Sequence, residues 1–151
     1  MEIKRDNLEN EKVVALLHEH LSDMRATSPP ESVHALDVNA LTLPNITFFS
    51  AWEGDALAGC IAIKKLNGTD AEIKSMRTSH AYRRQGVGNK LLVFLLDYAK
   101  EQGYLRISLE TGTQDYFLPA RKLYKKFGFV DCGPFSNYKL DPNSHFMSRD
   151  I

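Results

Sequence analysis

The sequence predicts an α+β fold with a mixed, mostly antiparallel central sheet. Three strand-like runs between residues 46 and 78 are separated only by short turns, which is typical of an antiparallel meander. A strand, a helix with an apolar stripe and a second strand then occupy residues 71–110. This order indicates a βαβ crossover, which makes its two strands parallel. A chain of 151 residues can bury a full core, so we expect a single domain over residues 1–151.

The N-terminal part is expected to hold one short strand and two helices. Residues 2–5 are predicted as the strand, and the first helix begins near residue 9. Its apolar residues recur at i, i+3 and i+4 spacing: Val13, Leu16, Leu17, Leu21 and Met24. Ser28-Pro29-Pro30 ends this helix, because proline lacks a backbone donor and restricts the residue before it. Residues 31–43 are expected to form a second, shorter helix.

The central strands are predicted from aromatic and β-branched residues bounded by turns. Residues 46–53 read ITFFSAWE and form the first of them, and Gly54-Asp55 is a tight turn. Residues 56–66 form the next strand, and Asn67-Gly68 then indicates a hairpin. Residues 71–78 complete the meander.

The C-terminal half is expected to alternate helices and strands. A helix over residues 87–102 carries an inward stripe and stops at Gly103. Residues 104–110 form the parallel strand, and a short helix over residues 119–127 has proline near its first turn. Strands over residues 129–135 and 145–150 close the fold. The total is about seven strands and about four helices.

Composition excludes several functional classes. The 19 basic and 19 acidic residues give zero formal net charge, so nothing draws the whole chain to nucleic acid or to a membrane surface. No apolar run approaches ~18 residues and the N-terminus has no apolar segment, so neither a membrane span nor a signal peptide is expected. The expected location is the cytoplasm.

No metal site is expected. Cys60 and Cys132 are far apart and match no metal-ligand spacing, so we expect them to be buried, reduced thiols. His18 and His20 are two residues apart on a helix and therefore point to different faces.

The connection Arg83-Arg84-Gln85-Gly86-Val87-Gly88 lies between a strand and the long helix. The first backbone N–H groups of a helix have no partner within it and carry a partial positive charge. Glycines let a ligand approach the backbone closely. The loop therefore predicts a phosphate or pyrophosphate site. It is not a P-loop, because Gly-Lys-Ser/Thr is missing, and the antiparallel lead-in argues against a dinucleotide fingerprint.

The sequence from Ile46 to the C-terminus resembles the GNAT superfamily of N-acetyltransferases. The resemblance rests on EIKSMRTSHAYRRQGVGNKLL, in which Arg83-x-x-Gly86-x-Gly88 is similar to the pyrophosphate loop of that superfamily, and on ARKLYKKFGF at residues 120–129. It implies the GNAT acyl-CoA N-acyltransferase fold and direct transfer of an acetyl group from acetyl-CoA to a primary amine of a small molecule. Two alternatives remain open: a non-catalytic acyl-CoA-binding regulatory module, and an acetyltransferase acting on a protein amine. A homodimer is compatible with the family.

The resemblance also implies where acetyl-CoA binds. Backbone N–H groups of residues 84–89 would hold the pyrophosphate. A bulged strand before the loop would meet the pantetheine arm, and an N–H near Met76 would polarise the thioester carbonyl. The expected contact residues are Met76, Arg77, Thr78, Arg83, Arg84, Gln85, Gly86, Val87, Gly88 and Asn89.

Three residues are candidates for acid–base catalysis. Tyr124 is similar in position to the tyrosine that protonates the coenzyme A thiolate in many superfamily members, although it could simply pack on the sheet. Glu72 and Glu110 are candidates for the general base or for substrate binding, and each could instead be a structural carboxylate. Lys74 and Arg77 either face the acceptor site, where they would favour an amine bearing a carboxylate or phosphate, or lie on a solvated strand face.

Overall fold

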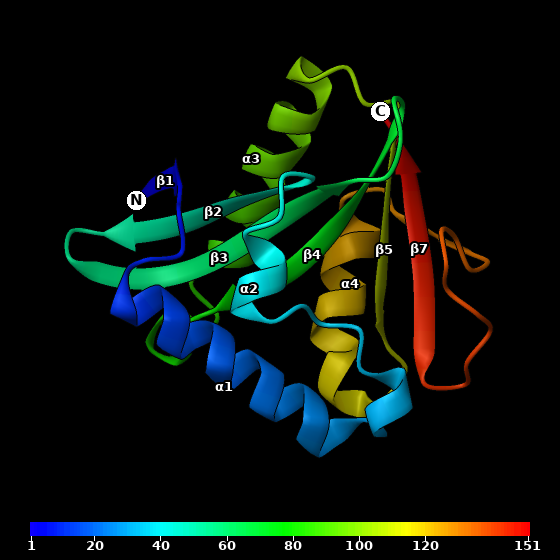
Figure 1. The fold of residues 1–151 in the computed structure, drawn as a ribbon, viewed down its shortest axis with the longest axis horizontal. Helices are drawn as coiled ribbons and strands as arrows, with labels where there is room; N and C mark the ends of the chain where they lie inside the picture. The colour runs from blue at the N-terminus through cyan, green and yellow to red at the C-terminus, as the bar shows by residue number, and fades with distance from the viewer.

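The computed structural model describes all residues from 1 to 151 and contains one seven-stranded sheet (Figure 1). The strand order is β1-β2-β3-β4-β5-β7-β6, and only β4 and β5 are parallel. The strands are β1 Glu2–Arg5, β2 Ile46–Glu53, β3 Ala56–Lys65, β4 Asp70–Thr78, β5 Arg106–Gly112, β6 Val130–Cys132 and β7 Ser144–Asp150. The predicted mixed sheet, the antiparallel meander and the crossover are all confirmed.

Helices cover both faces of the sheet. They are α1 Glu11–Thr27, α2 Val38–Leu41, α3 Val87–Glu101 and α4 Leu118–Lys126, with short 3₁₀ turns η1 Pro30–Ser32, η2 His80–Tyr82 and η3 Asp115–Phe117. Helices α1 and α2 lie on one face in Figure 1, and α3 lies on the other. None of these helices has the length and apolar character needed to span a bilayer.

Each face of the sheet carries its own apolar core. On the face of α3, Phe49, Ile61 and Ile63 pack against Leu91 and its neighbours in the helix. On the face of α1 and α2, the alternate residues of the same strands pack against Val13, Leu16 and Leu17. Because side chains alternate across a strand, β2 and β3 are mainly apolar and are buried on both faces.

The predicted helix over residues 31–43 is wrong. The chain makes one 3₁₀ turn at Pro30–Ser32, continues in an irregular path, and forms helix only at Val38–Leu41. Tertiary contacts take the groups that a helix would use: the His34 carbonyl accepts a hydrogen bond from Lys74 Nζ at 3.1 Å. The side chain of Asp37 then caps α2 by accepting from the Ala40 N–H at 2.8 Å.

The last hairpin is also shorter than expected. Strand β6 spans only Val130–Cys132, because Gly133 and Pro134 follow and proline cannot donate to a ladder. All three residues of β6 are exposed at the sheet edge. Both cysteines are free, but Cys132 is therefore exposed and only Cys60 is buried as expected.

Candidate active site

The central cavity lies where β4 and β5 separate. The two strands pair only at their N-terminal ends, where Asp70–Glu72 faces Arg106–Ser108. Beyond this point β4 stays paired with β3 and β5 stays paired with β7. In the view of Figure 1, α4 is seen between the two diverging strands, and its residues pack in the core on the side of α3. A cavity of about 640 Å³ occupies this region and is lined by residues of α1, β4, β5, α4 and the loop from Arg83 to Gly88, called the glycine loop below. Parallel strands that diverge in this way commonly hold a ligand at their carboxyl ends.

The glycine loop forms one end of this cavity. Gly86 has φ +79° and directly precedes α3, and Arg84 has φ 63°. No backbone N–H from Arg84 to Asn89 donates to a backbone carbonyl, so six consecutive donors are available. A Cβ atom on Gly88 would lie 2.8 Å from Leu123 Cδ2, so a side chain there would require Leu123 on α4 to shift. This arrangement fits a pyrophosphate group.

The two arginine side chains of the loop are exposed, whereas Val87 is buried in the core. Arg83 and Arg84 are exposed, and both belong to the cavity lining together with Gly86, Val87, Gly88 and Asn89. Gln85 does not line the cavity, because its side-chain amide donates to the Ala81 carbonyl at 3.0 Å.

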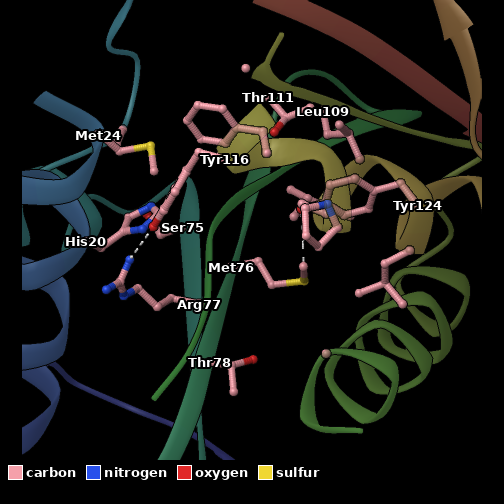
Figure 2. A pocket seen from close by; sticks show the side chains of 18 of the residues that line it. His20, Met24, Ser75, Met76, Arg77, Thr78, Leu109, Thr111, Tyr116 and Tyr124 are labelled. Carbon is pink, nitrogen blue, oxygen red and sulfur yellow. Dashed lines mark hydrogen bonds between the residues drawn. The ribbon is translucent and has the colours of Figure 1, made fainter. Parts of the chain in front are cut away.

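Strand β4 carries a bulge beside the cavity. Cys60 pairs with Arg77 and Ala62 pairs with Lys74, so β4 has one residue more than β3 between these pairs. Ser75 has φ 52°, and its carbonyl accepts a contact from Cys60 Sγ at 3.3 Å. The bulge turns Met76 toward α4, whereas Arg77 points toward α1 (Figure 2). Thr78 ends the strand and also lines the cavity.

Tyr124 on α4 and Glu110 on β5 both line the cavity. Tyr124 on α4 is 6% exposed, and its hydroxyl lies 4.0 Å from Met76 Sδ (Figure 2). Burial raises the pKa of Tyr124, so the phenol is neutral at pH 7. Glu110 on β5 is half-buried. Burial raises its pKa from 4.5 to about 7, and the neighbouring Glu72 carboxylate adds to this rise.

Glu72 lies in a different environment from Glu110. It is 2% exposed and does not line the cavity. Its Oε2 atom accepts from the Tyr138 hydroxyl at 2.5 Å and lies 3.4 Å from Lys74 Nζ. Glu72 is thus occupied by two partners from β4 and from the segment between β6 and β7.

Lys74 and Arg77 are buried and lie on the face of α1, so they do not form a solvated strand face. Lys74 Nζ already has three partners: the His34 carbonyl at 3.1 Å, Glu72 at 3.4 Å and the Tyr138 hydroxyl at 2.9 Å. The Nη2 atom of Arg77 is paired with Glu19 and Asp23 on α1, and the residue also lines the cavity.

Several residues of the cavity region could not be selected from the sequence. His20 on α1, Tyr116 in η3 and Asn143 before β7 line the cavity, and Tyr138 packs against its wall. They come from segments spread between residues 20 and 143, so no local pattern marks them. The structure contains no group of three or more His, Cys, Asp or Glu residues arranged for a metal ion.

Comparisons with known proteins agree with this geometry. The sequence model of the Acetyltransferase (GNAT) family matches residues 13–129. The uncharacterized N-acetyltransferase YsnE of Bacillus subtilis (strain 168) is 52% identical over 100% of both chains. The uncharacterized N-acetyltransferase YedL of Escherichia coli (strain K12) is 49% identical over 99% of this chain and 94% of its own.

Solved structures with bound cofactor share the fold. A GNAT family acetyltransferase from Elizabethkingia anophelis with acetyl-CoA bound has a TM-score of 0.73 at 16% identity, covering 99% of this chain and 97% of its own. A Bacillus subtilis acetyltransferase in complex with CoA has a TM-score of 0.70 at 21% identity, covering 99% and 98%. The family match and the two relatives are decisive: the chain belongs to the GNAT family and is an acetyl-CoA-dependent acyltransferase.

Proposed function

We propose that the protein transfers the acetyl group of acetyl-CoA to a primary amine of a small molecule. The observation that carries this proposal is the enclosure of the cavity on the side of α1. Ser32 donates to Asp141 Oδ2 at 2.6 Å, which ties the segment after α1 to the segment before β7. Tyr138 closes the same wall through its 2.5 Å hydrogen bond to Glu72. Such a wall admits a small molecule, whereas a protein segment needs an open groove.

The donor end of the cavity accounts for acetyl-CoA binding. The free N–H groups from Arg84 to Asn89 would hold the pyrophosphate, with added charge from the exposed Arg83 and Arg84 side chains. The backbone of Met76 and Thr78 would contact the pantetheine arm. Neither Ser75 nor Met76 has a partner in the β3–β4 register, so an N–H at this bulge can point to the thioester oxygen.

Glu110 is proposed as the general base. Its pKa of about 7 makes it ionised in part of the population and able to take a proton from the amine, directly or through a water molecule. Glu72 is proposed to have a structural role, because its carboxylate is held by Tyr138 and Lys74 and lies away from the cavity. As the amine nitrogen bonds to the acetyl carbon, the carbon–sulfur bond breaks, and Tyr124 donates its proton to the leaving thiolate.

A regulatory module that binds acyl-CoA without catalysis would not need this acid–base arrangement. Here a neutral phenol and a carboxylate with a raised pKa line one cavity. This pairing favours an enzyme over a binding module.

The test is an acetyl-CoA-dependent thiol-release assay over a panel of small amines and a panel of peptides. We expect saturable release with small amines and none with peptides. Calorimetry with acetyl-CoA provides the control for donor binding. Tight acetyl-CoA binding without release by any amine would contradict the proposal and favour the regulatory module.

A further inference from the structure

One wall of the cavity contains three buried side-chain atoms that have no hydrogen-bond partner. They are His20 Nδ1, Ser75 Oγ and Arg77 Nε. All three residues line the cavity, and Figure 2 shows them together between α1 and β4. Ser75 is 8% and Arg77 6% exposed. Buried polar atoms are nearly always paired in native proteins, so three unpaired atoms at one place indicate a ligand-binding wall.

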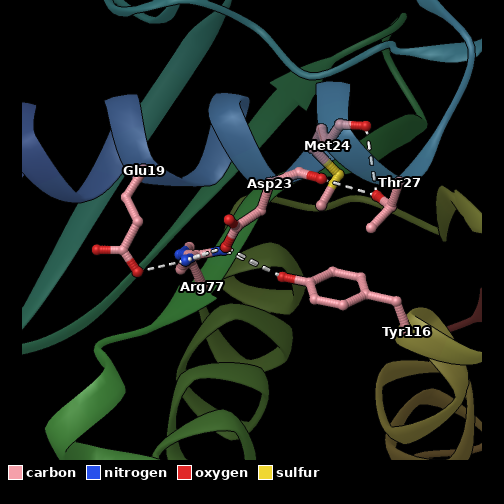
Figure 3. A network of polar contacts seen from close by, with 6 residues as sticks. All are labelled: Glu19, Asp23, Met24, Thr27, Arg77 and Tyr116. Carbon is pink, nitrogen blue, oxygen red and sulfur yellow. Dashed lines mark hydrogen bonds and ion pairs between the residues drawn. The ribbon is translucent and has the colours of Figure 1, made fainter.

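The charge on this wall is already compensated. Arg77 Nη2 lies 2.5 Å from Glu19 Oε1 and 2.7 Å from Asp23 Oδ2, and Arg77 Nη1 donates to the Tyr116 hydroxyl at 3.4 Å (Figure 3). One guanidinium thus faces two carboxylates. A carboxylate on the substrate would be repelled by Glu19 and Asp23, and the single free donor that Arg77 offers is its Nε–H.

His20 is uncharged at neutral pH. Burial and the nearby Arg77 lower its pKa from 6.5 to about 4, so the imidazole is neutral at pH 7. A neutral imidazole has one nitrogen that donates and one that accepts, and a serine hydroxyl can do both. The wall therefore presents a donor at Arg77 and adaptable partners at His20 and Ser75. A hydroxyl or carboxamide matches this combination without bringing charge.

Tyr116 also lines the cavity and contacts this wall. Its ring reaches Arg77 from η3, and its hydroxyl donates to Asp23 Oδ2 at 3.3 Å (Figure 3). The two hydrogen bonds of this hydroxyl are long, and the residue is 44% exposed. Tyr116 is therefore held only weakly beside the wall, whereas the ion pairs of Arg77 are short.

We propose that His20, Ser75 and Arg77 bind an uncharged hydroxyl or carboxamide group of the acceptor, so that the favoured substrates are small amino alcohols or amino amides. The inference rests on the proposed acetylation of small amines and specifies their class. Since Ser75 directly precedes Met76, this group lies only a few bonds from the reacting nitrogen. Lys74 does not take part, because its ammonium group already has three partners.

The test compares four amines of similar length that differ at the far end: 3-aminopropan-1-ol, β-alaninamide, β-alanine and n-butylamine. We expect kcat/KM for the alcohol and the amide to exceed that for the carboxylate and the alkyl amine by about tenfold or more. The alkyl amine leaves the polar atoms of the wall without partners, and the carboxylate is repelled by Glu19 and Asp23.

Variants of the wall provide the second measurement. Arg77→Lys removes Nε but keeps a cation beside Glu19 and Asp23, and Ser75→Ala removes one hydroxyl. Each is expected to reduce the ratio of kcat/KM between 3-aminopropan-1-ol and n-butylamine by several-fold. His18→Gln, at an exposed position of α1, is the control and should leave the ratio unchanged.

The possible results separate the two proposals. Equal kcat/KM values, the highest value for β-alanine, or a ratio that the variants do not change would overturn this inference and leave the proposed function intact. If none of the amines is acetylated while acetyl-CoA still binds, the proposed function fails and the inference fails with it. The wild-type panel decides the matter even if a variant does not fold.

Discussion

Replacing Glu110 by glutamine should stabilise the fold at pH 8 and greatly slow catalysis. The carboxyl group has a pKa of about 7 in the folded protein against 4.5 for an unperturbed glutamate. This difference corresponds to about 3 kcal/mol at 1.36 kcal/mol for each pKa unit. Glutamine has nearly the shape of the protonated acid and does not ionise, so Glu110→Gln removes the cost of burying the charge.

The sign of the pH effect follows from proton binding. Between pH 4.5 and 7 the folded state holds the Glu110 proton that the unfolded chain has released, so the contribution of this group to stability falls as pH rises. The difference in unfolding free energy between Glu110→Gln and the wild type should therefore shift in favour of the variant by up to about 3 kcal/mol from pH 4.5 to pH 8. Groups distant from Glu110 titrate equally in both proteins and cancel in this difference.

Urea unfolding at pH 5, 6, 7 and 8 measures the stability, and thiol release measures the activity. The wild-type kcat/KM should rise through about pH 7 as Glu110 ionises. In Glu110→Gln this rise in the pH profile should be absent, and kcat should fall by about 10²- to 10⁴-fold. Titration of the amine affects both proteins alike. Glu101→Gln, at the exposed end of α3, is the matched control. A stability difference that does not change with pH would refute the pKa argument, and an unchanged rate would refute the role as base.

Three further substitutions test the remaining parts of the site. Tyr124→Phe should lower kcat by about 10²-fold or more and leave acetyl-CoA affinity in calorimetry nearly unchanged; equal kcat would remove Tyr124 as the acid. Gly86→Glu should abolish acetyl-CoA binding, because a side chain at φ +79° is strained and its carboxylate opposes the pyrophosphate; unaltered affinity in a variant with a wild-type circular dichroism spectrum would count against the pyrophosphate site. Glu72→Gln should cost about 3–5 kcal/mol in urea unfolding, since it breaks the buried pair with Lys74; a loss of activity without loss of stability would instead return Glu72 to the role of base.

The fold was largely predictable from local patterns. Apolar spacing identified α1 and α3, and turn residues such as Asn67-Gly68 separated the strands of the meander. The prediction failed for residues 31–43, where tertiary hydrogen bonds to the His34 carbonyl and the Ser32 hydroxyl hold the chain in an irregular path. Such bonds reach residues 40 and 109 positions away, so helix propensity alone could not anticipate them.

The donor side of the site could be predicted from local sequence, whereas the acceptor side depends on tertiary contacts. The loop from Arg83 to Gly88 is continuous in sequence, and its glycines and its place before α3 define an anion site on local grounds. By contrast, Glu72 and Glu110 both lie on strands, and nothing local distinguishes them. Their surroundings differ because Tyr138 and Lys74 enclose Glu72, whereas β5 turns Glu110 into the cavity.

The sequence by itself determined the succession of strands along the chain, the crossover and the glycine-containing turn before α3, because periodicity, turns and helix termini depend on neighbouring residues. Only the tertiary structure decided which carboxylate lines the cavity, that Arg77 is paired with Glu19 and Asp23, and that His20 and Ser75 remain unpaired. Burial and pairing arise when segments distant in the chain meet, and the pKa values and hydrogen-bonding capacity of the site follow from them.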